Sequence, residues 1–331
     1  MTILFVGGED SDVNFVGANS VLTTGSNAGA TRRTTYARST FMVTMATDFV
    51  SVPLGTPQTS FWLTARHNIA NIGVTSNDMI LFCDGATTKF VLKGSDSSPT
   101  RKWALYKNGV LTGSLGLAIA CDALVKLDIY VSYAVSGRLT VYSNGVQVFD
   151  YSGDLTSSGS STLDSVKLSS LTTYNSTYYS THWSELIAAT TDTRSLGLAT
   201  LPPLANGNAQ SWTGAVTDIN EITLSDATAI TSATANQIAE FTISNLGAIT
   251  ATTPIVGLSI NARAARGSTG PQNAQLVTRI AATDYVSPTQ SLTLSLAPVT
   301  YNFLTNPATS AAWSGADLLA TGFNIGIKSI A

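Results

Sequence analysis

The chain has 331 residues, and only 11% of them are charged, against roughly 25% in an ordinary soluble domain. An apolar content of 44% excludes a disordered chain, while a net charge of −3 leaves no basic footprint for nucleic acid. No apolar run reaches the ~20 residues of a membrane helix, and the first residues show neither a basic nor a long apolar segment. We therefore expect no membrane insertion, no nucleic-acid partner and no secretory signal.

Alternation of apolar and polar residues recurs along the chain. Apolar side chains occupy every second position from Val125 to Tyr133. The opposite, solvated face of this run would carry Lys126, Asp128 and Ser132. The same alternation occurs at residues 139–142, 292–296 and 323–328. Period-two alternation is typical of a half-buried antiparallel strand, and no stretch shows a sustained helical period.

Two Asn-Gly pairs stand between strand-like runs, Asn108-Gly109 and Asn144-Gly145. Asn-Gly tolerates the positive φ angles of a type I′ turn, so both pairs predict β-hairpins. Together with the alternation, they predict an all-β fold with two antiparallel, jelly-roll-like β-sandwich domains.

The domain boundary is indicated by a change in composition. Residues 1–200 hold 13 basic and 14 acidic residues, whereas residues 201–331 hold 4 and 6. Residues 201–208 are rich in Pro, Asn and Gly, which are typical of turns and connections. We predict one sandwich over 1–200 and a second over 201–331, with the connection near 201–212.

Residues for catalysis are sparse. The two histidines, His67 and His182, have no serine on a glycine-flanked turn to accompany them. Glycosidic cleavage needs two carboxylates across the scissile bond, and no strand-like run carries a close array of them. Glu185 is isolated, and Asp218 lies in an acidic cluster with Glu221. There is no phosphate-binding glycine motif. We therefore expect no enzymatic activity, no catalytic residue and no organic cofactor.

The two cysteines, Cys83 and Cys121, match no metal-binding spacing. Two buried free thiols are favoured, with a disulfide between them as the alternative. The acidic residues near the start, Glu9, Asp10 and Asp12, form either a weak calcium site or a solvated turn.

Tyrosines are concentrated in residues 174–183, among Ser, Thr and Asn. This composition is typical of recognition loops, and it also fits cross-strand packing. Aromatic rings stack on sugar faces, so the candidate ligand-binding residues are Trp62, Tyr174, Tyr178 and Tyr179.

Three of the four basic residues after position 200 are arginines, Arg263, Arg266 and Arg279. They form either one interface patch on the second sandwich or scattered solubilising charges.

Several longer motifs of the chain have to be considered together. The first is Phe-Val-Gly-Gly-Glu-Asp-Ser-Asp at residues 5–12. The others are at residues 183–188, 192–202, 212–221, 263–267 and 306–313. With these motifs the chain resembles structural proteins of tailed bacteriophages, in which a concanavalin A-like or laminin-G-like jelly roll ends in a Trp-Ser-Glu strand and leads into a second β domain. The glucanase acid array is absent, and no complete lectin calcium site can be mapped onto the chain.

The resemblance implies a non-enzymatic virion structural protein, made in the host cytoplasm and carried on the tail or as a capsid accessory. Its expected partners are other virion proteins, further copies of itself and a glycan of the host surface. Many copies would strengthen modest contacts, and the poorly charged second domain is the one expected to dock. The alternative is a carbohydrate-binding module, and the remaining hypothesis is a polysaccharide hydrolase that uses Glu185 or Asp218.

Overall fold

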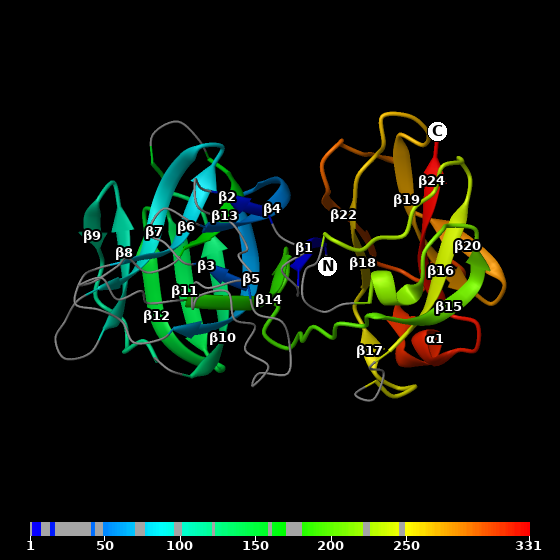
Figure 1. Ribbon diagram of the computed structural model, residues 1–331. Coiled ribbons are helices and arrows are strands. Elements are labelled where there is room, and N and C mark those ends of the chain that lie inside the picture. Colours follow the sequence, from blue (N-terminus) through cyan, green and yellow to red (C-terminus); the bar gives the residue numbers. More distant parts are fainter. Residues whose placement is uncertain are drawn as a thin grey trace. The chain divides into compact units, whose positions relative to one another are not determined.

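The computed structural model has two compact units, Met1–Leu198 and Ala199–Ala331, built almost entirely of strands (Figure 1). It describes residues 2–7, 14–16, 41–43, 49–69, 77–95, 101–120, 123–157, 161–169, 181–220, 226–244 and 249–331. Every pairing of named strands in these ranges is antiparallel. The predicted all-β fold of antiparallel sandwiches is therefore confirmed.

The first unit ends at Leu198, two residues before the boundary that the composition indicates. The turn-rich residues 201–208 do not form an irregular connection. Most of them belong to the strand β15 (Pro203–Gln210), which pairs with β16 (Ile238–Ile243). Its Gly and Asn residues lie where the register shifts between Asn206 and Gln210, so they mark a bulge in a strand.

The first unit consists of two seven-stranded sheets. One sheet, in spatial order, contains β1 (Ile3–Gly7), β14 (Thr181–Ala189), β5 (Ser60–Ile69), β10 (Leu124–Ser132), β11 (Gly137–Ser143) and β12 (Val146–Gly153), with β3 (Phe41–Val43) paired to β14. The other contains β2 (Asn14–Val16), β4 (Phe49–Gln58), β13 (Leu163–Ser169), β6 (Asn77–Asp84), β7 (Thr87–Ser95), β8 (Lys102–Lys107) and β9 (Val110–Thr112).

The core of the first unit lies between these sheets. Alternate residues of β5 and β10 point into it, including Phe61, Leu63 and Ile129, and meet Phe82 and Trp103 from the other sheet. All five are almost completely buried. The alternation in residues 125–133 therefore identifies the core face of β10 correctly.

Both predicted Asn-Gly hairpins are present. Asn108 and Gly109 connect β8 to β9, and Asn144 and Gly145 connect β11 to β12. The φ angles are +51° and +76° in the first turn and +49° and +82° in the second. Two successive positive φ angles define the type I′ turn that matches the twist of the strands.

The second unit is built around a six-stranded sheet with the order β15, β16, β24 (Asn324–Ile330), β19 (Asn273–Ile280) and β20 (Thr283–Val286), with β21 (Gln290–Ser291) paired to β19. Two strand pairs complete it, β17 (Pro254–Ile255) with β23 (Trp313–Ser314) and β18 (Leu258–Ala264) with β22 (Ala297–Phe303). A 3₁₀ turn (η3, Val216–Asp218) and a short helix (α1, Gly315–Leu319) lie between strands. Leu276 of β19 shares one core with Ile260 and Phe303 of the β18–β22 pair.

Two expectations for the second unit are wrong. Residues 292–296 form a bend after β21 instead of a strand, and Leu294 is 65% exposed. Local bonds hold this bend, since the Thr293 hydroxyl donates to the Ser295 carbonyl. In β24, the face expected to be solvated carries Asn324 and Gly326, which are both buried because the chain of β15 and β16 covers them.

Candidate functional site

One face of the first sheet carries polar and aromatic side chains instead of core residues, and we call it the outer face. Its members come from β5, β10, β11 and β12. They are Trp62, Thr64, Arg66, Lys126, Asp128, Tyr130, Arg138, Thr140, Tyr142 and Asp150. The strand register sets their arrangement, because Tyr130 lies opposite both Trp62 and Thr140, and Asp128 lies opposite both Thr64 and Tyr142. Residues far apart in the chain are therefore side by side.

Three aromatic rings cluster on this outer face. The ring centroid of Trp62 lies 5.1 Å from that of Tyr130 and 6.2 Å from that of Tyr142. The guanidinium carbon of Arg194 lies 5.1 Å from the Trp62 ring centroid and 4.7 Å from the Tyr142 ring centroid. This is the geometry of a cation–π contact with two rings. All three rings are half-buried, so part of each is accessible.

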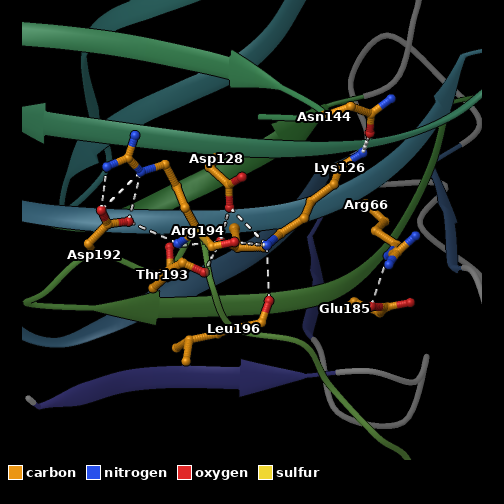
Figure 2. A network of polar contacts seen from close by, with 10 residues as sticks. Arg66, Lys126, Asp128, Asn144, Glu185, Asp192, Thr193, Arg194 and Leu196 are labelled. Atoms are coloured by element: carbon orange, nitrogen blue, oxygen red, sulfur yellow. Dashed lines mark hydrogen bonds and ion pairs between the residues drawn. The ribbon is translucent and has the colours of Figure 1, made fainter. Parts of the chain in front are cut away.

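The chain that follows β14, residues 190–198, crosses the outer face, and we call it the strap. Lys126 holds it by donating from Nζ to the carbonyl oxygens of Arg194, at 2.6 Å, and Leu196, at 2.9 Å (Figure 2). Thr193 is fully buried, and its Oγ1 lies 2.7 Å from Oγ1 of Thr64. The strap thus covers one part of the outer face and delivers Arg194 to the aromatic rings.

The prediction that Asp128 lies on a solvated face is wrong. Its side chain is only 2% exposed. The strap covers it. Its Oδ1 accepts the Thr64 hydroxyl at 2.5 Å and lies 3.5 Å from Lys126 Nζ. A hydroxyl group has a single hydrogen to donate, so the Thr193 hydroxyl is the donor toward Thr64. The buried carboxylate is therefore both hydrogen-bonded and paired, as burial of a charge requires.

Four ion pairs lie on the outer face and its strap. They are Arg66–Glu185, Lys126–Asp128, Arg138–Asp150 and Arg194–Asp192. The Arg138 and Arg194 pairs are bidentate, with Nε and Nη2 both donating to the partner carboxylate. The hydrogen bonds from Arg194 and Arg138 lower the pKa values of the Asp192 and Asp150 carboxyls, respectively. Both carboxylates are therefore charged at neutral pH.

Glu185 reaches Arg66 because of a β-bulge in β14. The register between β14 and β5 shifts between Ser184 and Ile187, and Glu185 has a φ of +52°. A positive φ is uncommon for a residue other than glycine. It turns Glu185 toward Arg66 Nε, 3.0 Å from Oε2, while Leu186 fills the core. The glutamate proposed as an isolated hydrolase residue is thus 8% exposed and ion-paired.

The second unit has its own buried carboxylate, Glu240 of β16. Its side chain is completely buried under the bulge of β15, and Oε2 accepts the backbone N–H of Ala209 at 3.0 Å. Within the described part of the unit, Oε1 has no hydrogen-bond partner, and it lies 3.9 Å from Nη1 of Arg279, which is also paired with Asp284. Burial and the neighbouring Asp284 raise the pKa of Glu240 to about 6.

Of the residues predicted to bind a ligand or a metal ion, the structure describes one. Trp62 lies on the outer face, whereas Tyr174, Tyr178 and Tyr179 lie outside the described residues, as do Glu9, Asp10 and Asp12. In the described part of the chain, no group of three His, Cys, Asp or Glu side chains could hold a metal ion. Cys83 is a buried free thiol, and Cys121 also lies outside the described residues.

The three arginines predicted for an interface each have a partner within the second unit. Arg263 makes a bidentate pair with Asp226, Arg266 donates to Gln272, and Arg279 pairs with Asp284 and Glu240. They come from β18, the segment after it and β19. The charges on Arg263 and Arg279 are thus already compensated, and an interface role for the three stays a prediction.

Sequence reasoning missed Tyr130, Tyr142, Arg194 and its partner Asp192. The signal for the tyrosines was present, because each occupies a polar-face position of an alternating strand. Arg194 gave no comparable signal, since its position over Trp62 depends on the course of the strap.

Comparison with known proteins finds distant structural matches. No family model matches the chain, and no curated protein does. Alginate lyase Aly36B is 12% identical over 59% of this chain and 95% of its own, with a TM-score of 0.38. An endo-β-1,4-glucuronan lyase from Trichoderma reesei is 9% identical over 57% and 96%, with a TM-score of 0.39. The galectin LEC-6 of Caenorhabditis elegans is 8% identical over 43% and 90%, with a TM-score of 0.31.

These three TM-scores lie below 0.5, and we draw no conclusion from the matches. Within the described ranges, no helix has the length and apolar character to cross a membrane.

Proposed function

We propose that this chain is a non-enzymatic structural protein of a tailed-phage virion, and that it binds a glycan through the outer face of its first unit. The virion role is supported by the sequence motifs and by the succession of two antiparallel sandwiches that the resemblance implies. Glycan binding is supported by one observation, the half-buried aromatic cluster of Trp62, Tyr130 and Tyr142 among paired polar groups.

This cluster has the chemistry that a sugar requires. The C–H face of a pyranose ring stacks on an aromatic ring, while its hydroxyls need both donors and acceptors. Trp62 and Tyr130 supply ring surface, and the neighbouring Arg138–Asp150 pair presents donors and acceptors together. Thr140 donates to Asp150 and lies directly opposite Tyr130, so it lies between the aromatic rings and the Arg138–Asp150 pair.

The absence of turnover is part of the proposal. A glycosidase needs two carboxylates on either side of one bond. Glu185 is nearly buried and paired with Arg66, and Asp218 accepts the Ala215 backbone N–H at η3 in the other unit. His67 is 1% exposed within the core, where no substrate reaches it. Turnover of a surface polysaccharide that is lost with Glu185→Gln would overturn this part.

Glycan binding is tested with the full chain on a printed panel of oligosaccharides. Trp62→Ala is expected to weaken binding about fivefold or more, on the scale of the roughly 1–3 kcal/mol that one stacked aromatic ring contributes to the binding of a nucleic-acid base. Tyr106→Ala is the matched control, since Tyr106 is a half-buried aromatic residue of the second sheet. Thermal unfolding of both variants checks the fold. Equal binding by wild type and Trp62→Ala would refute the assignment of the site.

The virion role is tested by electron microscopy of the native particle with the chain labelled. Label on the tail or capsid would support it, and absence from the particle would overturn it. Sedimentation of the purified chain tests the expected homo-oligomer, through which many weak glycan contacts would act together.

A further inference from the structure

We infer that the outer face is selective for a neutral glycan and discriminates against chains that carry carboxylate or sulfate groups. The inference rests on the proposed glycan binding and names the ligand class for that site. It follows from how the charges of the outer face are arranged.

Each cationic side chain that the structure describes on this face already has a carboxylate partner. Arg138 and Arg194 use two N–H groups each on Asp150 and Asp192, at 2.9 and 3.1 Å and at 2.9 and 2.6 Å. Lys126 is occupied by two strap carbonyls and Asp128. An anionic sugar would therefore have to displace a carboxylate that belongs to the protein.

Displacement would leave a protein carboxylate unpaired beside the charge of the ligand. The carboxylates of Asp192 and Asp150 are 44% and 32% exposed, so a ligand on the aromatic cluster would meet them directly. Like charges brought together at an interface oppose binding. The same pairs admit a neutral sugar, because an arginine has five N–H groups and each pair uses only some of them. Hydroxyls can therefore bond to a pair without breaking it.

Arg194 is the specificity-determining residue in this arrangement. Its guanidinium lies against both Trp62 and Tyr142, so it borders the surface on which a sugar ring would stack. Its charge is compensated by Asp192, two residues earlier in the same strap. Removing the charge of Asp192 would leave the charge of Arg194 uncompensated, which would attract an acidic sugar.

The test compares the full-length wild type with Asp192→Asn and Asp150→Asn on neutral hexose oligosaccharides and on uronate- and sialate-containing ones. We expect wild type to bind a neutral probe at least about tenfold more tightly than any anionic probe. Each variant should shift this ratio toward anionic probes by about fivefold, a shift that salt reduces. Asp78→Asn is the matched control, because it removes an equal charge from the Lys93 pair of the other sheet and should leave the ratio unchanged.

The outcomes separate the two proposals. Wild-type binding to anionic probes as tight as to neutral ones would overturn the inference and leave glycan binding standing. Binding to no probe would overturn glycan binding itself, and the inference with it. An unchanged ratio in both variants would overturn the role of the ion pairs, and the use of two separate pairs guards against one variant failing to fold.

Discussion

His67 is a buried histidine in the core of the first unit. It is 1% exposed, and among the described residues neither ring nitrogen has a hydrogen-bond partner. Two tryptophans flank it, with ring centroids 5.6 Å away for Trp183 and 6.4 Å away for Trp103. Burial lowers the pKa of His67 to about 3. The imidazole of the folded protein is therefore neutral at both pH 7 and pH 5.

The lowered pKa makes the stability of the first unit depend on pH. In the unfolded chain the histidine has its ordinary pKa of 6.5. Between pH 6.5 and 3 the unfolded state binds a proton that the folded state does not bind, so stability is complete above pH 6.5 and falls as the pH falls. With 1.36 kcal/mol for each pKa unit, His67 alone removes about 2 kcal/mol of unfolding free energy between pH 7 and pH 5.

The variant His67→Phe isolates this contribution, because it keeps a planar ring between the tryptophans and cannot be protonated. The measurement is urea unfolding followed by tryptophan fluorescence at pH 7 and pH 5. We expect the stability of His67→Phe relative to wild type to rise by about 2 kcal/mol between pH 7 and pH 5. Trp103→Phe is the control for packing in the same cluster, and its cost should be equal at the two pH values.

A stability difference between His67→Phe and wild type that is the same at pH 7 and pH 5 would refute this reasoning. It would mean that the folded state accommodates the imidazolium, through a partner or a water path to the ring nitrogens. A signal from the ring protons that titrates near pH 6.5 in the folded protein would lead to the same conclusion by an independent route.

Three further predictions concern single side chains. Glu240→Gln should abolish a pH trend of the opposite sign in the second unit. Because the pKa of Glu240 is raised from 4.5 to about 6, stability is complete below pH 4.5 and is lost as the pH rises through 6. At 1.36 kcal/mol for each pKa unit, the variant should gain about 2 kcal/mol over wild type between pH 4 and pH 8, measured by calorimetry. Gly326→Ala should cost at least about 2 kcal/mol in the same experiment, since its Cβ would lie 2.2 Å from a backbone oxygen, whereas Gly197→Ala meets no atom within 4 Å and should be neutral. Asn144→Ala should cost about 1 kcal/mol in urea unfolding, because Asn144 adopts a φ of +49° and accepts the Lys126 N–H.

Features set by neighbouring residues were predictable from the sequence. The core face of β10 follows from alternation, because one buried sheet face imposes a period of two. The hairpins at Asn108-Gly109 and Asn144-Gly145 follow from the positive φ angles that those residues tolerate. In each case the deciding interactions lie within a few residues of one another, so one stretch of sequence carries the information.

In residues 292–296, alternation predicted a strand that the structure does not have. Their leucines alternate as in a strand, but Leu294 is exposed, and the backbone amide of Leu292 donates to Gln272 before the chain bends. Alternation indicates which side chains could share a face, and it contains no information on whether a partner strand is available. The prediction for residues 201–208 was wrong in the opposite sense. Their composition predicted a connection, but most of them form a strand, because β16 is available to pair with them.

Of the candidate site, the sequence analysis predicted Trp62, and the way in which the other parts come together depends on contacts between distant residues. Thr64 meets Thr193, which is 129 positions later in the chain. Tyr130 joins Trp62 through the register of β10 and β5, which no local pattern reveals. The placement of Arg194 additionally requires the course of the strap, which has no regular secondary structure and therefore no periodic signal.

The two buried carboxylates, Asp128 and Glu240, follow one physical rule. Each occupies a strand position whose face would be solvated in an isolated sheet, and each is covered by chain that flanks the boundary between the units. The strap brings the Thr193 hydroxyl to Thr64, whose hydroxyl donates to Asp128, and the bulge of β15 brings the Ala209 N–H to Glu240. A polar group can be covered only if it keeps hydrogen-bond partners, so an acidic residue in a strand can select the segment that packs over it. Asp128 and Glu240 interrupt the alternation of their strands because each is bonded to the chain that covers it. In the first unit, the course of that chain also places Arg194 beside Trp62.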